Sequence, residues 1–203
     1  MNRCAFGWLP ILATLSAAAC ASGCGPDHFA VVEPGVLYRS GQVRKDSLEE
    51  IHEQCGIRTI VDLVAERRGS PFVAAEGEFA REKGIRYIHL PIPPVSMGVE
   101  NFAQWLPPFF EILDDHRNHP VLVHCWKGIK RTGVMVAIYR MEYQRWDNAE
   151  ALRGLSAFGR TPEDFTLAER EFILNYVPRW KRKPVAPGGS DARPASPASP
   201  APR

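Results

Sequence analysis

Cysteine is nearly absent from the body of the chain. Of five cysteines in 203 residues, three lie among the first 24, which leaves Cys55 and Cys125 for everything that follows. Two cysteines cannot form a disulfide scaffold, so stability must come from a hydrophobic core, and a chain of this length can build one. A surplus of one charge is also lacking, because the formal net charge is +2. This balance gives no general case for binding nucleic acid.

Long apolar runs are missing too, apart from one near the N-terminus. Residues 6–19 are mostly apolar, follow the positive charge of Arg3, and are too short for a comfortable membrane span. Small residues then precede Cys20 and Cys24, and each resembles a bacterial lipoprotein processing site. Flanking glycines favour Cys24 as the lipidated residue, and an ordinary cleaved signal is the alternative. We expect a signal peptide over residues 1–24 and an exported, membrane-anchored protein on the periplasmic or cell-surface side of a bacterial membrane.

Composition divides the rest of the chain into three parts. A tether over residues 25–30 leads to a folded domain over residues 31–183, and residues 184–203 are rich in Pro, Ala and Ser. Such a tail cannot bury a core and is predicted to be disordered. In the domain, helical patterns alternate with strand-like runs at 36–38 (an edge strand), 57–63, 86–90 and 121–123. This alternation predicts a three-layer α/β fold with a mainly parallel sheet of four to five strands flanked by helices.

Capping patterns place several helix ends. Ser47 and Glu50 have the spacing of a capping box, which predicts a helix start there. The prolines at 107 and 108 should kink the helix predicted over residues 101–114 or start a second one. Near the C-terminus, Thr161 followed by proline predicts the start of a helix that runs to about Trp180.

The most informative stretch runs from residue 120 to residue 140 and has the pattern of a strand, a tight loop and a helix. A loop that opens a helix points backbone N–H groups at one spot, and the helix dipole makes that spot positive. Gly128 lets the loop curl, and Arg131 can bind two oxygens of a phosphoryl group at once. Cys125 lies in this cradle, where its thiolate is favoured as a nucleophile aimed at phosphorus. The alternative is a buried structural cysteine beside a chance arginine.

The string HCWKGIKRTG, residues 124–133, resembles the phosphate-binding loop of cysteine-dependent protein tyrosine phosphatases, in particular the small dual-specificity branch and its bacterial members. The likeness extends to LYRSGQV (37–43), TIVDL (59–63) and RYIHLPI (86–92). The resemblance implies hydrolysis of phosphoesters through a thiophosphoryl intermediate, without a metal or other cofactor. The substrate would be a phosphorylated protein or another phosphomonoester.

The resemblance also assigns roles within the loop. Cys125 is the nucleophile, the Thr132 hydroxyl stabilises the thiolate as it leaves, and His124 supports the loop. Substrate binding falls to Trp126, Lys127, Gly128, Ile129, Lys130 and Arg131. The two lysines raise the local positive potential, so they either bind a second anionic group or simply face solvent.

A proton donor for the leaving oxygen is harder to find. The family usually carries an Asp in the loop after the strand at 86–90, but no Asp occurs between Tyr87 and Leu113. Glu100 is the candidate general acid, although it could equally be an N-terminal helix residue favoured by the dipole. Asp62 is predicted instead to be a structural acid that accepts N–H bonds at the end of a buried strand.

Three functions therefore remain open. The first is a phosphatase of the protein tyrosine or dual-specificity type. The second is a phosphate-binding module with little turnover, which the missing Asp suggests. The third is a phosphatase of phosphoinositides or similar inositol phosphate polyanions, which the loop lysines suggest. No metal site is predicted, because His116 and His119 have no Cys or carboxylate at ligand spacing.

Overall fold

The computed structural model describes residues 28–65, 71–93, 100–158 and 161–182. The predicted signal peptide, Cys24, nearly all of the tether and the C-terminal tail lie outside these ranges. Among the helices in the described ranges, none combines the length and the apolar character needed to cross a membrane.

Five strands form one sheet in the order β1 (Ala30–Glu33), β2 (Leu37–Ser40), β5 (Val121–His124), β3 (Thr59–Asp62) and β4 (Arg86–His89). The β1–β2 pair is antiparallel and the other three pairs are parallel. The mainly parallel sheet is thus confirmed. The prediction of an edge strand at 36–38 is wrong, because β1 pairs with β2 on its outer side.

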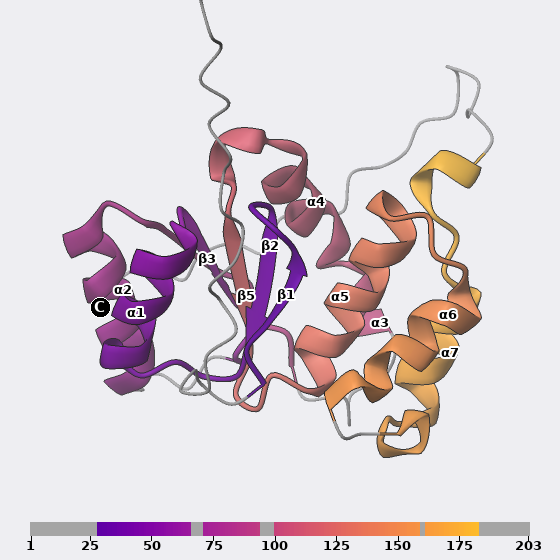
Figure 1. The fold of residues 1–203 in the computed structure, drawn as a ribbon. Coiled ribbons are helices and arrows are strands. Elements are labelled where there is room, and N and C mark those ends of the chain that lie inside the picture. Colours follow the sequence, from indigo (N-terminus) through magenta and orange to yellow (C-terminus); the bar gives the residue numbers. More distant parts are fainter. Residues whose placement is uncertain (1–27, 66–70, 94–99, 159–160, 183–203) are drawn as a thin grey trace, which may run out of the picture.

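Helices cover both faces of the sheet (Figure 1), which confirms the three layers. One face carries α1 (Lys45–Cys55) and α2 (Pro71–Lys83). The other carries α3 (Glu100–Ala103), α4 (Leu106–Asp114), α5 (Lys130–Tyr143), α6 (Asn148–Arg153) and α7 (Leu167–Asn175). Side chains alternate along each strand, so β5 sends Leu122 into the core beneath α1 and α2 and Val123 into the larger core on the other side.

Two helix starts differ in how well the sequence predicted them. The prediction that a capping box at Ser47 starts a helix is wrong. The α1 helix begins earlier, after Arg44, and no side-chain hydrogen bond caps it among the described residues. The prolines at 107 and 108 do start a second helix, α4, at its first turn. Proline is tolerated there because the first N–H groups of a helix have no partner within it.

The predicted single helix from Thr161 to Trp180 is wrong. A short 3₁₀ turn, η4 (Pro162–Asp164), comes first, and Thr166 then caps α7 by accepting a hydrogen bond from the Glu169 N–H at 3.2 Å. Pro178 prevents the helix from continuing, because it lacks an N–H donor and disfavours helical angles in the residue before it. The chain ends its described part in another 3₁₀ turn, η5 (Arg179–Lys181). Two further 3₁₀ turns are η2 (His116–Asn118) and η3 (Gly154–Phe158).

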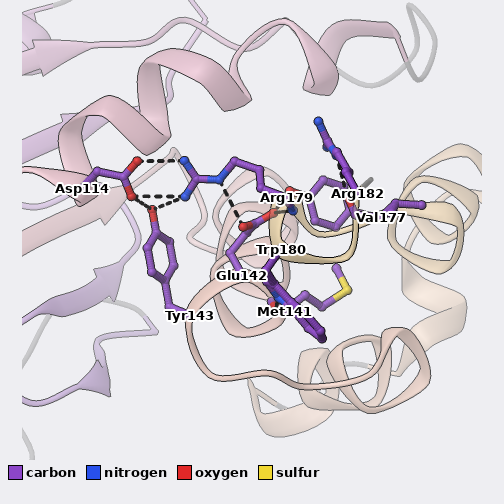
Figure 2. Close-up of polar contacts among 9 residues, drawn as sticks. Asp114, Met141, Glu142, Tyr143, Val177, Arg179, Trp180 and Arg182 are labelled. Atoms are coloured by element: carbon purple, nitrogen blue, oxygen red, sulfur yellow. Dashed lines mark hydrogen bonds and ion pairs between the residues drawn. The ribbon is translucent and has the colours of Figure 1, made fainter. Parts of the chain in front are cut away.

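Arg179 ties this last segment to the helical layer. Figure 2 shows its guanidinium between Asp114, at the end of α4, and Glu142, near the end of α5. Its Nη1 lies 2.7 Å from Asp114 Oδ2, and its Nε lies 3.1 Å from Glu142 Oε2. Tyr176 adds a hydrogen bond from its hydroxyl to Glu142. The buried Glu142 carboxylate is therefore held by partners that are distant in sequence.

Candidate active site

The carboxyl ends of the parallel strands bring polar residues to one level of the sheet. The strand register places Ser40, His124, Asp62 and His89 side by side at the ends of β2, β5, β3 and β4. In sheets of this type, ligands bind beyond the carboxyl ends of the strands. The Cys125 loop leaves the sheet at this edge, between β5 and α5.

Gly128 shapes the loop. Its φ of +65° is left-handed, and a Cβ there would lie 2.5 Å from Gly41 N and 2.6 Å from the Ser40 carbonyl carbon. The loop therefore packs directly on the backbone that follows β2, and only glycine fits. A hydrogen bond of 3.0 Å from Gln42 N to Trp126 O joins the same two segments. These contacts curl the loop ahead of α5 and leave Cys125 only 4% exposed.

Arg39 lies behind the loop, and sequence reasoning missed its role. Its guanidinium is 2% exposed and donates a hydrogen bond to Gly128 O. Burial lowers the pKa of Arg39 to about 10, while the charge of Cys125 acts in the opposite direction. A buried cation thus lies close enough to the cysteine to interact with it. The one available signal was an arginine within the strand-like run LYRS.

His124 is fully buried between two acids. Its Nε2 lies 3.3 Å from Glu76 Oε2, and its Nδ1 lies 3.9 Å from Asp62 Oδ1. Burial alone would lower the pKa of His124, but Glu76 and then Asp62 outweigh burial and raise it to about 9. Asp62 also accepts hydrogen bonds from Val64 N at 2.8 Å and from the Tyr87 hydroxyl at 2.7 Å. Its predicted structural role is therefore confirmed.

Glu76 was missed as well. It lies on α2, and the signal was a glutamate on the face of the helix that carries the buried Phe79 and Ala80. Together, Asp62, Glu76 and His124 place ligand atoms within 4.8 Å of one another, a spacing that could hold a metal ion. Both imidazole nitrogens face carboxylates, however, and a metal would take only one of them. A doubly protonated imidazole fits this arrangement better.

The remaining predicted residues of the loop lie at the same edge. Arg131 donates through Nη1 to Leu63 O at 3.4 Å, and the buried Thr132 hydroxyl has no hydrogen-bond partner in the part of the chain that the structure describes. Ile129 is buried, whereas Trp126 is 51% exposed and Lys127 faces solvent.

Two candidate residues are not placed with the others. The Lys130 side chain is 47% exposed, and its Nζ lies 3.9 Å from the buried carboxylate of Glu169. Glu100 begins α3, but its side chain lies outside the described part of the structure.

Several known proteins that this chain resembles are phosphatases by name. A family model described as "DSP-PTPase phosphatase fused to NAD+ Kinase" matches residues 25–172. Inositol diphosphatase DSP1 of Oryza sativa subsp. japonica is 35% identical over 126 residues, which are 60% of this chain and 52% of the relative. The dual specificity protein phosphatase TpbA of Pseudomonas aeruginosa is 25% identical over 183 residues, which are 81% of this chain and 78% of TpbA.

Among solved structures, the core catalytic domain of the PP-IP phosphatase SIW14 from S. cerevisiae, in complex with citrate, has a similar fold. Its TM-score is 0.63 at 24% identity, and the match covers 77% of this chain and 89% of that one. The chain spans somewhat over half the length of the first curated relatives. Because the family model matches most of the chain, the protein belongs to the dual-specificity-like branch of the cysteine-dependent protein tyrosine phosphatase superfamily.

Proposed function

We propose that this protein is a phosphoester hydrolase in which Cys125 is the nucleophile. The observation that carries the proposal is the position of Cys125, in a curled loop at the N-terminus of α5 with the buried Arg39 behind it. In the first step the Cys125 sulfur bonds to phosphorus, and the bond from phosphorus to the leaving oxygen breaks. In the second step water attacks the phosphocysteine, the sulfur–phosphorus bond breaks, and inorganic phosphate leaves.

The surrounding residues would stabilise both transition states. Arg131 and the N–H groups of the loop face the equatorial oxygens, where negative charge accumulates. The Thr132 hydroxyl, buried and without a partner in the described ranges, can donate to the departing thiolate. Glu100 remains the proposed donor of a proton to the leaving oxygen.

We propose densely phosphorylated small molecules of the inositol diphosphate class as the substrates. Lys127 faces solvent next to the nucleophile, so its charge is available to a second phosphate, whereas Lys130 already lies beside Glu169. Three curated relatives at 30–35% identity are named inositol diphosphatases. These observations favour Lys127, rather than Lys130, as the lysine that binds a second anionic group of the substrate.

Phosphotyrosine is the second candidate substrate. Trp126 directly follows the nucleophile and is 51% exposed, which offers an aromatic face to a phosphorylated ring. TpbA, a dual specificity protein phosphatase, matches a larger share of this chain than the inositol diphosphatases do.

One panel of substrates tests these proposals. Phosphate release should be measured from an inositol diphosphate, a phosphotyrosine peptide, a phosphoserine peptide and a phosphoinositide. Cys125→Ser should abolish release from every one of them, because a serine hydroxyl is a far weaker nucleophile than a thiolate. Lys127→Ala should raise KM for the inositol diphosphate by about tenfold and leave the phosphotyrosine peptide nearly unchanged.

Several outcomes of the panel would contradict the proposals. Turnover that survives Cys125→Ser would exclude the mechanism, and phosphate binding without turnover in the wild type would identify a binding module. Lys130→Ala is the matched control for Lys127.

The role of Glu100 is tested with substrates that differ in their leaving group. Glu100→Gln should slow the hydrolysis of esters with poor leaving groups more than that of an activated aryl phosphate. If the substitution slowed both substrates equally, Glu100 would not be the general acid.

We also propose that the domain is exported and held at a bacterial membrane by a lipid on Cys24. Support comes from the sequence alone, since residues 1–24 lie outside the described part of the structure.

A further inference from the structure

Glu76 is a buried acid with one evident partner. Its side chain is 3% exposed, and among the described residues neither carboxylate oxygen accepts a hydrogen bond, but Oε2 lies 3.3 Å from His124 Nε2. Other acids of α2, such as Glu78 and Glu82, face solvent and lie beside basic side chains. Burying a carboxylate is costly unless an opposite charge compensates for it. A positive charge on His124 would therefore offset the cost of burying the Glu76 carboxylate.

The orientation of the imidazole fits that requirement. A neutral imidazole can donate from only one nitrogen, whereas an imidazolium donates from both. Here Nε2 faces Glu76 and Nδ1 faces Asp62. Each ring nitrogen therefore lies within ion-pair distance of a carboxylate, and neither makes a hydrogen bond among the described residues. A positive charge on the ring compensates both acids at these distances.

Among the described residues, three further titratable groups lie close to His124 and its acids. From β4, Tyr87 donates its hydroxyl to Asp62, and His89 contacts Val64 O at 2.8 Å through Nε2, which is 4.0 Å from Asp62 Oδ2. From β5 itself, Cys125 is the next residue and carries negative charge as a thiolate. Burial lowers the pKa of His124, but Glu76, Asp62 and Cys125 together raise it to about 9.

We propose that Glu76 is a positioning residue of the catalytic loop, which holds His124 as an imidazolium directly behind Cys125 and so favours the thiolate. The proposal rests on the proposed function in that Cys125 is the nucleophile. Glu76 itself touches no substrate. It acts through His124, in the same way that Arg39 supports the loop from the β2 side.

The test measures the thiolate directly and needs no turnover. The full-length protein is alkylated with iodoacetamide over a range of pH, and the modification of Cys125 is followed by mass spectrometry of its tryptic peptide, separately from the other cysteines. Glu76→Gln keeps the shape of the side chain and removes its charge. Without the Glu76 charge His124 should become neutral, and we expect the pH midpoint of Cys125 alkylation to rise by about one unit, because the thiolate loses a neighbouring positive charge. Glu78→Gln, an exposed acid on the same helix, is the matched control and should leave the midpoint unchanged.

A second measurement covers the case in which Glu76→Gln does not fold. In the ¹⁵N-labelled wild type at pH 7.5, both ring nitrogens of His124 should show the chemical shifts of an imidazolium, since a pKa raised to about 9 keeps the ring charged until the pH rises through that value. A neutral tautomer at this pH would overturn the proposal, as would a folded Glu76→Gln protein with an unchanged alkylation midpoint. A stoichiometric metal ion in the purified protein would also overturn it. A shifted midpoint in a protein that hydrolyses none of the panel would support Glu76 while rejecting the proposed function.

Discussion

At the scale of single residues, the loop depends on a position that only glycine can occupy. Gly128 combines a left-handed backbone with a close approach to the chain after β2, while Arg39 holds its carbonyl from behind. The sequence motif predicted a glycine that lets the loop curl. It did not reveal the neighbour that makes a Cβ impossible, because Ser40 and Gly41 are almost ninety positions earlier in the chain.

Gly128→Ala should therefore damage both stability and phosphate binding. The added Cβ would meet backbone atoms at 2.5–2.6 Å that have little freedom to move. We expect a loss of about 2–4 kcal/mol in the free energy of unfolding. Urea denaturation measures the first effect, and calorimetric titration with inorganic phosphate measures the weakened binding.

Gly77→Ala provides the control for this substitution. Gly77 lies within α2, and a Cβ there would meet its nearest atom, Tyr87 Cδ1, at 4.0 Å. Alanine should stabilise the helix by about 0.5–1 kcal/mol and leave phosphate binding intact. If both variants lost stability equally, the close approach at Gly128 would not be the cause.

At the scale of elements, the C-terminal segment is held in place by side-chain contacts and not by one continuous helix. The helical pattern after Thr161 breaks into η4, α7 and η5, and Arg179 then fixes the end of the chain against α4 and α5 (Figure 2). The breaks follow from local causes, the Thr166 cap and Pro178, which the sequence contains. The partners of Arg179 come from two other helices, and no local pattern identifies them.

Arg179→Ala should destabilise the protein by about 1–3 kcal/mol, because it removes a cation from the buried Glu142. The loss is limited, since the Tyr176 hydroxyl still donates to that carboxylate. Thermal denaturation followed by circular dichroism measures the change.

Arg117→Ala is the matched control for Arg179. Arg117 also pairs with an aspartate at 2.8 Å, but its side chain is 90% exposed. Its removal should leave the free energy of unfolding nearly unchanged, because water and salt screen a solvent-exposed ion pair. A similar loss for both arginines would mean that burial of Glu142 does not set the strength of this cluster.

At the scale of the whole molecule, the strand order determines which residues can cooperate. β5 lies between β2 and β3, so the Cys125 loop is flanked by Arg39 on one side and Asp62 on the other. The α2 helix then brings Glu76 to the same place from a different layer.

Export is also a property of the whole chain. When the full-length gene is expressed in a bacterium, Cys24→Ala should abolish incorporation of radiolabelled palmitate and release the protein from the membrane fraction. Cys20→Ala should change neither. Labelling that depends on Cys20 would move the processing site, and no labelling of the wild type would leave an ordinary signal peptide as the explanation.

The sequence alone determined the parts of this protein that depend on neighbours along the chain. The strand, loop and helix around Cys125 and the positions of most strands follow from local pattern, because backbone angles and hydrophobic periodicity are set locally. The prolines at 107 and 108 marked the α4 start as one of two alternatives, and the structure decided between them. The tertiary structure decided the rest. It showed that β2 is covered by β1, that Arg39 and Glu76 support the loop, and that His124 lies between two acids. These features depend on residues that are distant in sequence and meet only when the sheet and its helices pack together.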